Sequence, residues 1–361
     1  MSNEFFTTEH TQILQKLINE VVNDPTTYRG SEILPSVAIP VRTIMTEVIE
    51  ATGGLTSEHT MGTDPTYIRS FGTRVQKFEP PAYKEAIHYN EKDILNLREL
   101  GQNDRSRRGI RQRLDKDIDR LNRRIEARIE KQRWDAIFTG GFSYMGETFS
   151  YGIPAGNRGT SLGAVWSTDG INANASANPL QDIRYWTTGG FAPYRKYKIS
   201  KIWMNGNTSR WLLDNPNVRA YIANAYANPN IAKYDINAIM QFFIPGCPPV
   251  EIYDGWYQTE SVNVNDKLVV SDAIYFLPDG YIYFECALPG GDKIGEFVQG
   301  INLSSGTVDD PGFGKFLVVE ENIAPGTKGG PANPYIDVIG GVYGGIKLDM
   351  PFNTLTAKVI A

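Results

Sequence analysis

The stretch RSRRGIRQRLDKDIDRLNRRIEARIEKQRW, residues 105–134, decides the fold because it contains neither glycine nor proline after Gly109. Its apolar residues recur every three or four positions, at Ile110, Leu114, Ile118, Leu121, Ile125 and Ile129. This spacing predicts a helix with one narrow apolar stripe. A helix from about residue 105 to about residue 138 would be roughly 50 Å long, at about 1.5 Å per residue.

The charges of this helix favour a structural role over DNA reading. Residues 105–135 include twelve Lys and Arg and six Asp and Glu. Opposite charges recur three or four positions apart, as in Asp117 and Arg120, so many can pair along the helix surface. A DNA-reading helix usually keeps one face nearly free of acids, because attraction to phosphates dominates its affinity. DNA binding by this helix stays open as an alternative.

The remainder of the chain is acidic. The 361 residues have a formal net charge of −5, from 36 basic and 41 acidic side chains. Without the helix, 24 basic and 35 acidic residues remain, so a basic helix is part of an otherwise acidic chain. This polarity favours self-association through complementary patches at least as well as nucleic-acid binding. An apolar content of 41% is typical of a folded chain, here long enough for more than one domain.

The two cysteines, Cys247 and Cys286, are too few for a disulfide scaffold and fit a reducing compartment. Cys247 lies in a proline-rich turn without a local basic partner and Cys286 in an expected strand, so both are expected to be inert. The N-terminal residues lack the basic and apolar regions of a signal peptide. No apolar run approaches the length of a membrane span. We therefore expect a cytosolic site of synthesis and no membrane partner.

The first 90 residues suggest segments without a core of their own. A short amphipathic helix is expected at 9–23, followed by an extended arm punctuated by proline and glycine to about residue 40. Alternating residues between turns predict a long two-stranded hairpin from about 55 to 90. An isolated hairpin is at best marginally stable in water. We expect it to be braced by a further element, of this chain or of another one.

The part after the long helix alternates between helices and strands. A glycine–aromatic hairpin is predicted at 139–156, and a helix at 178–190, with Asn178 as its cap, Pro179 at its first position and Gly189 at its end. An α/β body should follow, and the tail 297–361 should return to strands. The elements expected in the body are strands at 197–205 and 250–258, helices at 207–214 and 215–227, and a hairpin at 273–286 on a Pro-Asp-Gly turn.

No motif for catalysis or cofactor binding survives inspection. The three histidines form no metal-binding spacing, and no G-x-S-x-G occurs. The segment GTVDDPGFGKF, 306–316, fails as a phosphate loop because Phe316 follows Lys315 where Ser or Thr is needed. The segment IGGVYGG, 339–345, lacks the dinucleotide spacing. We expect no catalytic, cofactor or metal site and a protein that is not an enzyme.

Seven segments, taken in order, are similar to those of a known family. They are GGLTSEHT at 53–60, KFEPP at 77–81, the long helix, TGGFSYMGETFSYGI at 139–153, IWMNGNTSRWLLDNPNVR at 202–219, YFLPDGYIYF at 275–284 and GIKLDMPFNTLTAKVIA at 345–361. In order and character they resemble the major capsid proteins of lambda-like tailed bacteriophages, the capsid protein E family. The resemblance runs from about residue 50 to the end, and the leader does not share it.

The resemblance implies an α+β chain with the Hong Kong 97 capsid fold. The expected parts are an N-terminal arm at 1–52, an extended loop at 53–92, a peripheral domain at 93–194 with a spine helix at about 105–138, an axial domain at 195–296, and a return to the peripheral domain at 297–361. A thin-striped helix suits such a flat subunit, where it lies across a sheet. Candidate inter-subunit contacts are Arg107, Arg108, Arg111, Arg69, Arg74 and Lys77.

The implied function is self-assembly, as hexamers and pentamers, into an icosahedral shell around double-stranded DNA. The implied partners are further copies of the chain, a portal protein and a decoration protein, with no sequence-specific DNA contact. Because no long acidic helical leader is present, a separate scaffolding protein is expected. The location would be the virion, after assembly in the host bacterial cytoplasm. The alternatives left open are an encapsulin-like shell around protein cargo, a DNA-binding protein and, least favoured, an enzyme.

Overall fold

The computed structural model describes residues 28–40, 43–49, 73–90, 92–93, 104–144, 146–188, 198–226, 236–262, 268–302, 312–322 and 335–361. The chain divides into two compact units, each built from separate stretches. Unit 1 comprises Met1–Ile44, Glu79–Arg133 and Phe297–Ile346, and unit 2 comprises Met45–Phe78, Trp134–Glu296 and Lys347–Ala361.

The long helix predicted from about 105 to 138 is confirmed. Helix α4 runs without interruption over Asp104–Phe138, 35 residues and therefore about 50 Å. The stripe residues whose burial is described, Ile118, Leu121, Ile125 and Ile129, are all buried. Residues up to Arg133 belong to unit 1, and Trp134 onward to unit 2.

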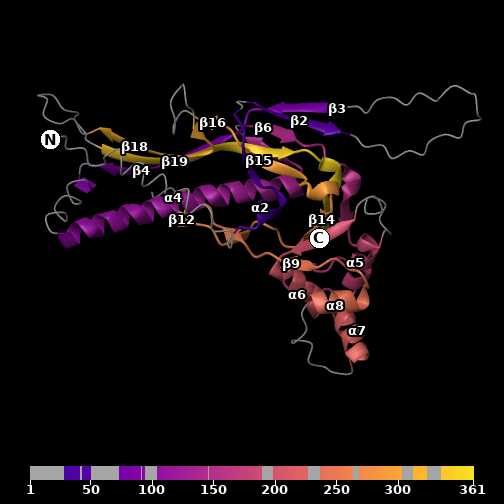
Figure 1. Cartoon of the computed structure of the whole chain (residues 1–361). Helices are drawn as coiled ribbons and strands as arrows, with labels where there is room; N and C mark the ends of the chain where they lie inside the picture. The colour runs from indigo at the N-terminus through magenta and orange to yellow at the C-terminus, as the bar shows by residue number, and fades with distance from the viewer. Residues whose placement is uncertain are drawn as a thin grey trace, which may run out of the picture. The chain divides into compact units, whose positions relative to one another are not determined.

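Unit 1 is a helix lying on a five-stranded sheet, as Figure 1 shows for α4 beside β18 and β19. The long strand β19 (Tyr335–Leu348) pairs antiparallel with both β18 (Lys315–Asn322) and β4 (Ala82–Asn90). On the same sheet, β19 is also next to β15 (Gly295–Gln299). Strand β15 in turn pairs in parallel with β1 (Ser36–Ala38). Smaller elements are α2 (Gly30–Ile33) and the two-stranded pair β16 (Ile301–Asn302) and β17 (Gly312–Phe313).

Unit 2 is an α/β body around a second five-stranded sheet. The strand order is β7 (Arg158–Thr160), β20 (Leu355–Lys358), β14 (Tyr281–Cys286), β8 (Ile199–Met204) and β9 (Val250–Ile252). Its helices are α5 (Pro179–Thr187), α6 (Gly206–Asp214), α7 (Pro216–Tyr226) and α8 (Ile236–Phe243), gathered near β9 and β14 in Figure 1. In the described part of unit 2, short 3-10 helices cover Ala155–Asn157, Pro289–Gly291 and Pro351–Asn353.

Local sequence signals explain how several of these elements begin. The side chain of Asn178 accepts a hydrogen bond from the Gln181 N–H, which caps α5 as predicted, with Pro179 in its first turn. The expected end at Gly189 lies outside the described residues. Asn205 caps α6 in the same way, through the Thr208 N–H at 2.8 Å. The predicted glycine–aromatic hairpin is confirmed as β5 (Gly141–Tyr144) and β6 (Glu147–Ser150).

Two predicted hairpins were wrong. In the stretch expected to fold on itself from 55 to 90, strand β4 pairs instead with β19, while β3 (Thr73–Phe78) pairs with β2 (Ile44–Ile49). The other is 273–286: β14 pairs with β8 and β20, while β13 (Ile274–Tyr275) pairs with β10 (Trp256–Tyr257). In both cases the strands pair with partners that lie farther away in the chain than the predicted local one.

The tail was also assigned too simply. Strands β18 and β19 do belong to the unit with most of the long helix, but β20 joins the sheet of unit 2 by pairing with β14 and β7. The strand predicted over 250–258 is divided into β9 and β10, and helix α8 was not anticipated.

Candidate assembly surfaces

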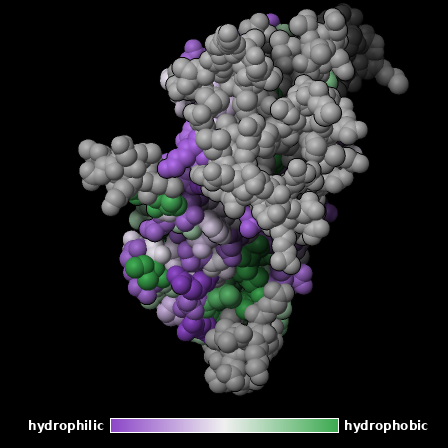
Figure 2. Space-filling model, turned by 90° about the vertical axis from the view of Figure 1, so that its left-hand side faces the viewer, coloured by the Kyte–Doolittle hydropathy of each residue, from purple (hydrophilic) through white to green (hydrophobic). Residues whose placement is uncertain are grey.

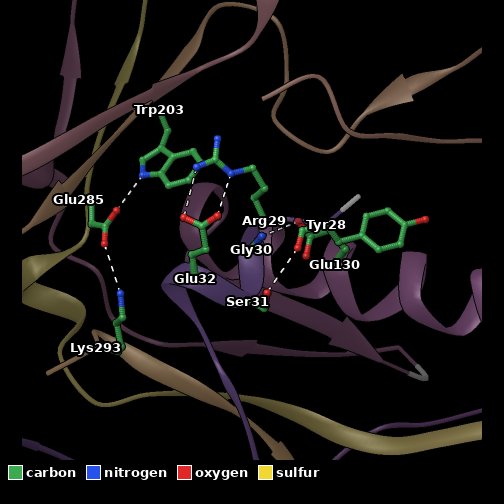
Figure 3. Close-up of polar contacts among 9 residues, drawn as sticks. All are labelled: Tyr28, Arg29, Gly30, Ser31, Glu32, Glu130, Trp203, Glu285 and Lys293. Atoms are coloured by element: carbon green, nitrogen blue, oxygen red, sulfur yellow. Dashed lines mark hydrogen bonds and ion pairs between the residues drawn. The ribbon is translucent and has the colours of Figure 1, made fainter. Parts of the chain in front are cut away.

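The N-terminal segment is fixed to α4 by a buried charged cluster. Glu130 is fully buried, and its Oε1 accepts a hydrogen bond from the Gly30 N–H at 2.8 Å (Figure 3). Arg133, 5% exposed, lies 3.3 Å from the other carboxylate oxygen and donates to Ser36 Oγ at 2.8 Å. A buried carboxylate is costly unless it is paired and hydrogen-bonded, so these contacts stabilise one another.

Position 30 needs glycine for a steric reason. A Cβ atom there would stand 2.6 Å from Glu130 Oε2, closer than real contacts allow. Burial, together with the charge of Glu130, raises the pKa of Tyr28 above its ordinary value. On the surface of the same segment, Arg29 pairs with Glu32 at 2.8 Å (Figure 3). The chain therefore enters the described part of unit 1 at a firm attachment point.

Glycines in β19 bring α4 close to the sheet. A Cβ at Gly340 would meet Leu121 Cδ2 at 2.3 Å, and one at Gly341 would meet the Phe316 ring at 2.5 Å. The glycines of IGGVYGG, rejected above as a nucleotide motif, thus leave room for the narrow apolar stripe and for neighbouring rings. The sequence spacing excluded a dinucleotide motif but did not indicate this role in packing.

Polar contacts flank the stripe along α4. Tyr89 of β4 donates to Asp117 at 2.7 Å, and Arg124 donates to Glu85, also of β4, at 3.0 Å. Such contacts pair the flanks of the helix with the strand beneath it. They confirm that the helix lies across a sheet, as expected from its thin stripe.

Lys315 of β18 is buried under the same helix. Its Nζ pairs with a Glu126 carboxylate oxygen, and its side chain is 11% exposed. Burial lowers the pKa of Lys315 to about 7, although the carboxylate beside it favours the charged form. The Lys of the rejected phosphate-loop motif is thus part of the helix–sheet contact.

Aromatic contacts within unit 2 fix the C-terminal end of β3. The Phe78 ring lies 5.3 Å from Phe142 and 4.7 Å from Phe149, both on the β5–β6 hairpin. Towards the other end of the strand, Val75 is 50% exposed. In the same unit, Trp203 donates to Glu285 at 2.9 Å, and Lys293 pairs with that carboxylate (Figure 3).

The six candidate contact residues are placed unevenly. Lys77 is exposed on β3. Arg74 belongs to the backbone of β3, and three others lie near the start of α4, but their side chains are outside the described part. Arg69 lies outside the described residues. Of the six side chains, the structure therefore describes only that of Lys77, and the three in α4 are Arg107, Arg108 and Arg111.

An exposed apolar ribbon was missed at the sequence level. Strands β10 and β13 pair, followed by β11 (Glu260–Val262) with β12 (Leu268–Val270), so the described residues within 255–276 form one antiparallel ribbon. Trp256, Val269, Val270 and Ile274 on this ribbon are each more than 40% exposed. On the face that Figure 2 displays, hydrophobic residues, in green, lie among hydrophilic ones, in purple. The signal was present in GWYQ, which follows Asp254, and in LVV, which ends two positions before Asp272.

Other chemistry is sparse in the described part of the chain. Both cysteines are buried, and burial raises the pKa of Cys247 to about 11 and that of Cys286 to about 12, which disfavours the reactive thiolate. Within the described residues, His, Cys, Asp and Glu form no group of three fit to hold a metal. No helix among them combines the length and apolar character needed to cross a membrane.

The fold defines the class of protein. The structure is similar to that of a prophage protein from E. coli CFT073 assigned as a capsid protein, with a TM-score of 0.56 and 12% sequence identity over 97% of this chain and 98% of that one. A phage-related protein from Bordetella bronchiseptica RB50 aligns with a TM-score of 0.47 and 10% identity, over 95% and 96% of the two chains. The fold is that of Hong Kong 97-type capsid subunits.

The sequence then identifies the family. The model of the family described as phage major capsid protein E matches residues 10–296. The chain therefore belongs to that family and is a phage major capsid protein, whose copies form the icosahedral shell of the virion. A comparison with curated proteins finds no match.

Proposed function

We propose that the chain assembles as hexamers and pentamers into a shell that encloses double-stranded DNA. The match to the major capsid family over residues 10–296 carries this proposal. A separate scaffolding protein would guide assembly in the host bacterial cytoplasm, a portal protein would occupy one vertex, and a decoration protein would bind outside. The role is structural, without catalysis and without reading of DNA sequence.

Within the shell, we assign the arm to 1–52, the extended loop to 53–92, the peripheral domain to 93–194 and 297–361, and the axial domain to 195–296. Two attachment points support this assignment. The buried Gly30–Glu130 contact would anchor the arm, and the Phe78 cluster would anchor one end of the loop. Both segments would then reach neighbouring subunits from firm roots. Strand β20, which pairs within unit 2, is the exception to this division.

The candidate contacts between subunits are Arg69, Arg74, Lys77, Arg107, Arg108 and Arg111. Their positive charge complements the acidic remainder of the chain. Lys77 is exposed beside the half-exposed Val75, which is the combination expected at the rim of an interface.

The proposal is tested by expressing the chain with and without the products of its neighbouring genes. Negative-stain images and sedimentation should show closed shells, with a uniform size only when the scaffolding protein is present. Shells from an intact infection should contain nuclease-protected DNA. Shells filled with a specific protein in place of DNA would favour the encapsulin-like alternative, and only monomers under every condition would contradict assembly.

A further inference from the structure

We infer that the ribbon of residues 255–276 docks on the basic first part of α4, residues 104–116, in a second copy of the chain. The inference rests on the proposed assembly and names a pair of surfaces that would join two subunits. Three features of the chain support this pairing: apolar exposure on both faces of the ribbon, the acidic charge of the ribbon, and the opposite charge at the start of α4.

Both faces of the ribbon expose apolar side chains. Trp256 pairs with Tyr275 and Tyr257 with Ile274, and successive residues of a strand point to opposite faces. Trp256, 53% exposed, and Ile274, 41% exposed, therefore lie on opposite faces. The neighbours Val269 and Val270 repeat the arrangement in β12. No single side of the ribbon could hide all of these residues.

Such a ribbon gains stability by being covered. A two-stranded sheet is marginal alone, and contiguous exposed apolar surface usually marks a binding site. Among the described strands, β11 and β12 pair only with each other. A chain that forms closed shells places many copies side by side, so a second copy is the occupant always present.

Charge indicates which part of the second copy fits. Residues 255–276 carry three carboxylates and one lysine. Residues 104–116 carry six basic and two acidic side chains. The two segments therefore have net charges of −2 and +4, and complementary patches of this kind set specificity and register. The acidic ribbon would repel DNA, which excludes DNA as its occupant.

The apolar pattern of the helix start agrees with the charge. Ile110 and Leu114 continue the stripe of α4 in sequence, ahead of Asp117, where Tyr89 of β4 contacts the helix. The ribbon presents carboxylates next to apolar residues in the same way: Glu260 stands opposite Val270, and Asp272 is exposed two positions later. An acidic, apolar ribbon and a basic, striped helix are complementary in both respects.

A charge swap between two chains tests the inference. One variant carries Glu260→Lys and Asp272→Lys, and the other carries Arg107→Glu and Arg108→Glu. Each alone should lower the fraction of chain that sediments as capsomers or shells by about tenfold, because like charges then face each other. When the two variants are mixed, each ribbon again meets a helix of opposite charge in another copy, and the assembled fraction should recover to roughly half of wild type or more.

The controls separate the possible results. Glu147→Lys with Asp292→Lys makes the same charge change at exposed positions outside the ribbon and should leave assembly unchanged.

A single chain with all four swapped residues should also assemble. Recovery in that chain but not in the mixture would show docking within one subunit and overturn the inference, as would an equal loss with the control pair. Wild-type shells with no rescue in any combination would overturn it too. Wild type that forms no shells would instead overturn the proposed function, and the inference with it.

Discussion

The two units are stabilised in different ways. Unit 2 packs a core of apolar side chains in which Trp166, Trp186 and Trp211 are fully buried. Unit 1 has a narrow apolar stripe on α4, which lies close to Gly340 of β19. The same helix buries Glu130 and Arg133, and its Glu126 pairs with Lys315 of β18. Apolar volume therefore stabilises unit 2, whereas close approach and charge pairing define unit 1. Such a helix–sheet layer leaves little tolerance for change at its few buried positions.

The largest effect is expected from Ile125→Asp in the stripe of α4. The change buries a charge without a partner, at a cost of several kcal/mol against a total stability of about 5–15 kcal/mol. The chain should accumulate as insoluble protein. Lys116→Asp, at an exposed position of the same helix, should leave a soluble subunit that melts cooperatively. Circular dichroism and solubility measure whether each variant folds. A soluble, folded Ile125→Asp chain would contradict the burial of the stripe.

In unit 2, Phe284→Ala should destabilise by about 3–5 kcal/mol, because the ring is fully buried and removal leaves a cavity. Its ring packs edge-on against Trp186, with centroids 5.8 Å apart. The control Phe242→Ala removes a ring that is 51% exposed on α8 and should cost less than about 1 kcal/mol. Urea unfolding of the two variants measures the difference, and equal losses would refute the core assignment.

The glycine contact in unit 1 is tested by Gly340→Ala. The added methyl group would overlap Leu121, and overpacking typically costs about 1–3 kcal/mol. Gly163→Ala in unit 2 is the matched change, since a Cβ there meets no atom within 4 Å, and it should be neutral or slightly stabilising. Leu121→Ala should cost about 2–5 kcal/mol by itself, because Leu121 is buried. In the double variant the two losses should sum to less than their separate values, since the smaller side chain makes room for the added methyl group. Fully additive losses would count against close helix–strand packing.

The smallest effect concerns Lys315 and pH. Its pKa is lowered to about 7 in the folded chain, so between that value and its ordinary pKa the unfolded chain binds more protons. Stability should therefore rise with pH, by about 1 kcal/mol from about pH 7 to about pH 8. Lys315→Met should abolish this rise, whereas Lys77→Met, at an exposed site, should retain it. A rise that persists in Lys315→Met would assign it to another group.

Local periodicity and capping explain what the sequence could predict. The bounds of α4, the cap at Asn178 and the β5–β6 hairpin each depend on residues a few positions apart. The partners of β4 and β14 could not be predicted, because each is chosen by ladders with strands far away in the chain. Helix α8 was missed because eight residues are too few to establish a period.

The assembly surfaces were harder to predict than the fold. Glu130 resembles any other acid of a charged helix, and its burial depends on a glycine 100 residues earlier. The only local hint is Arg133, three positions later. The ribbon of 255–276 combines short strands with exposed aromatic and branched residues, which by sequence look like core strands. Exposure of these side chains is a property of the folded chain, and periodicity could not reveal it.

The close contact at Gly340 of β19 also bears on how much a shell can contain. Because α4 lies almost on the backbone at Gly340, this layer of unit 1 is thinner than a helix packed on a larger side chain would be. For a fixed mass of protein, a thinner wall covers more area, and the volume that a closed wall encloses grows faster than its area. A residue without a side chain thus contributes to capacity, a property that no single subunit possesses.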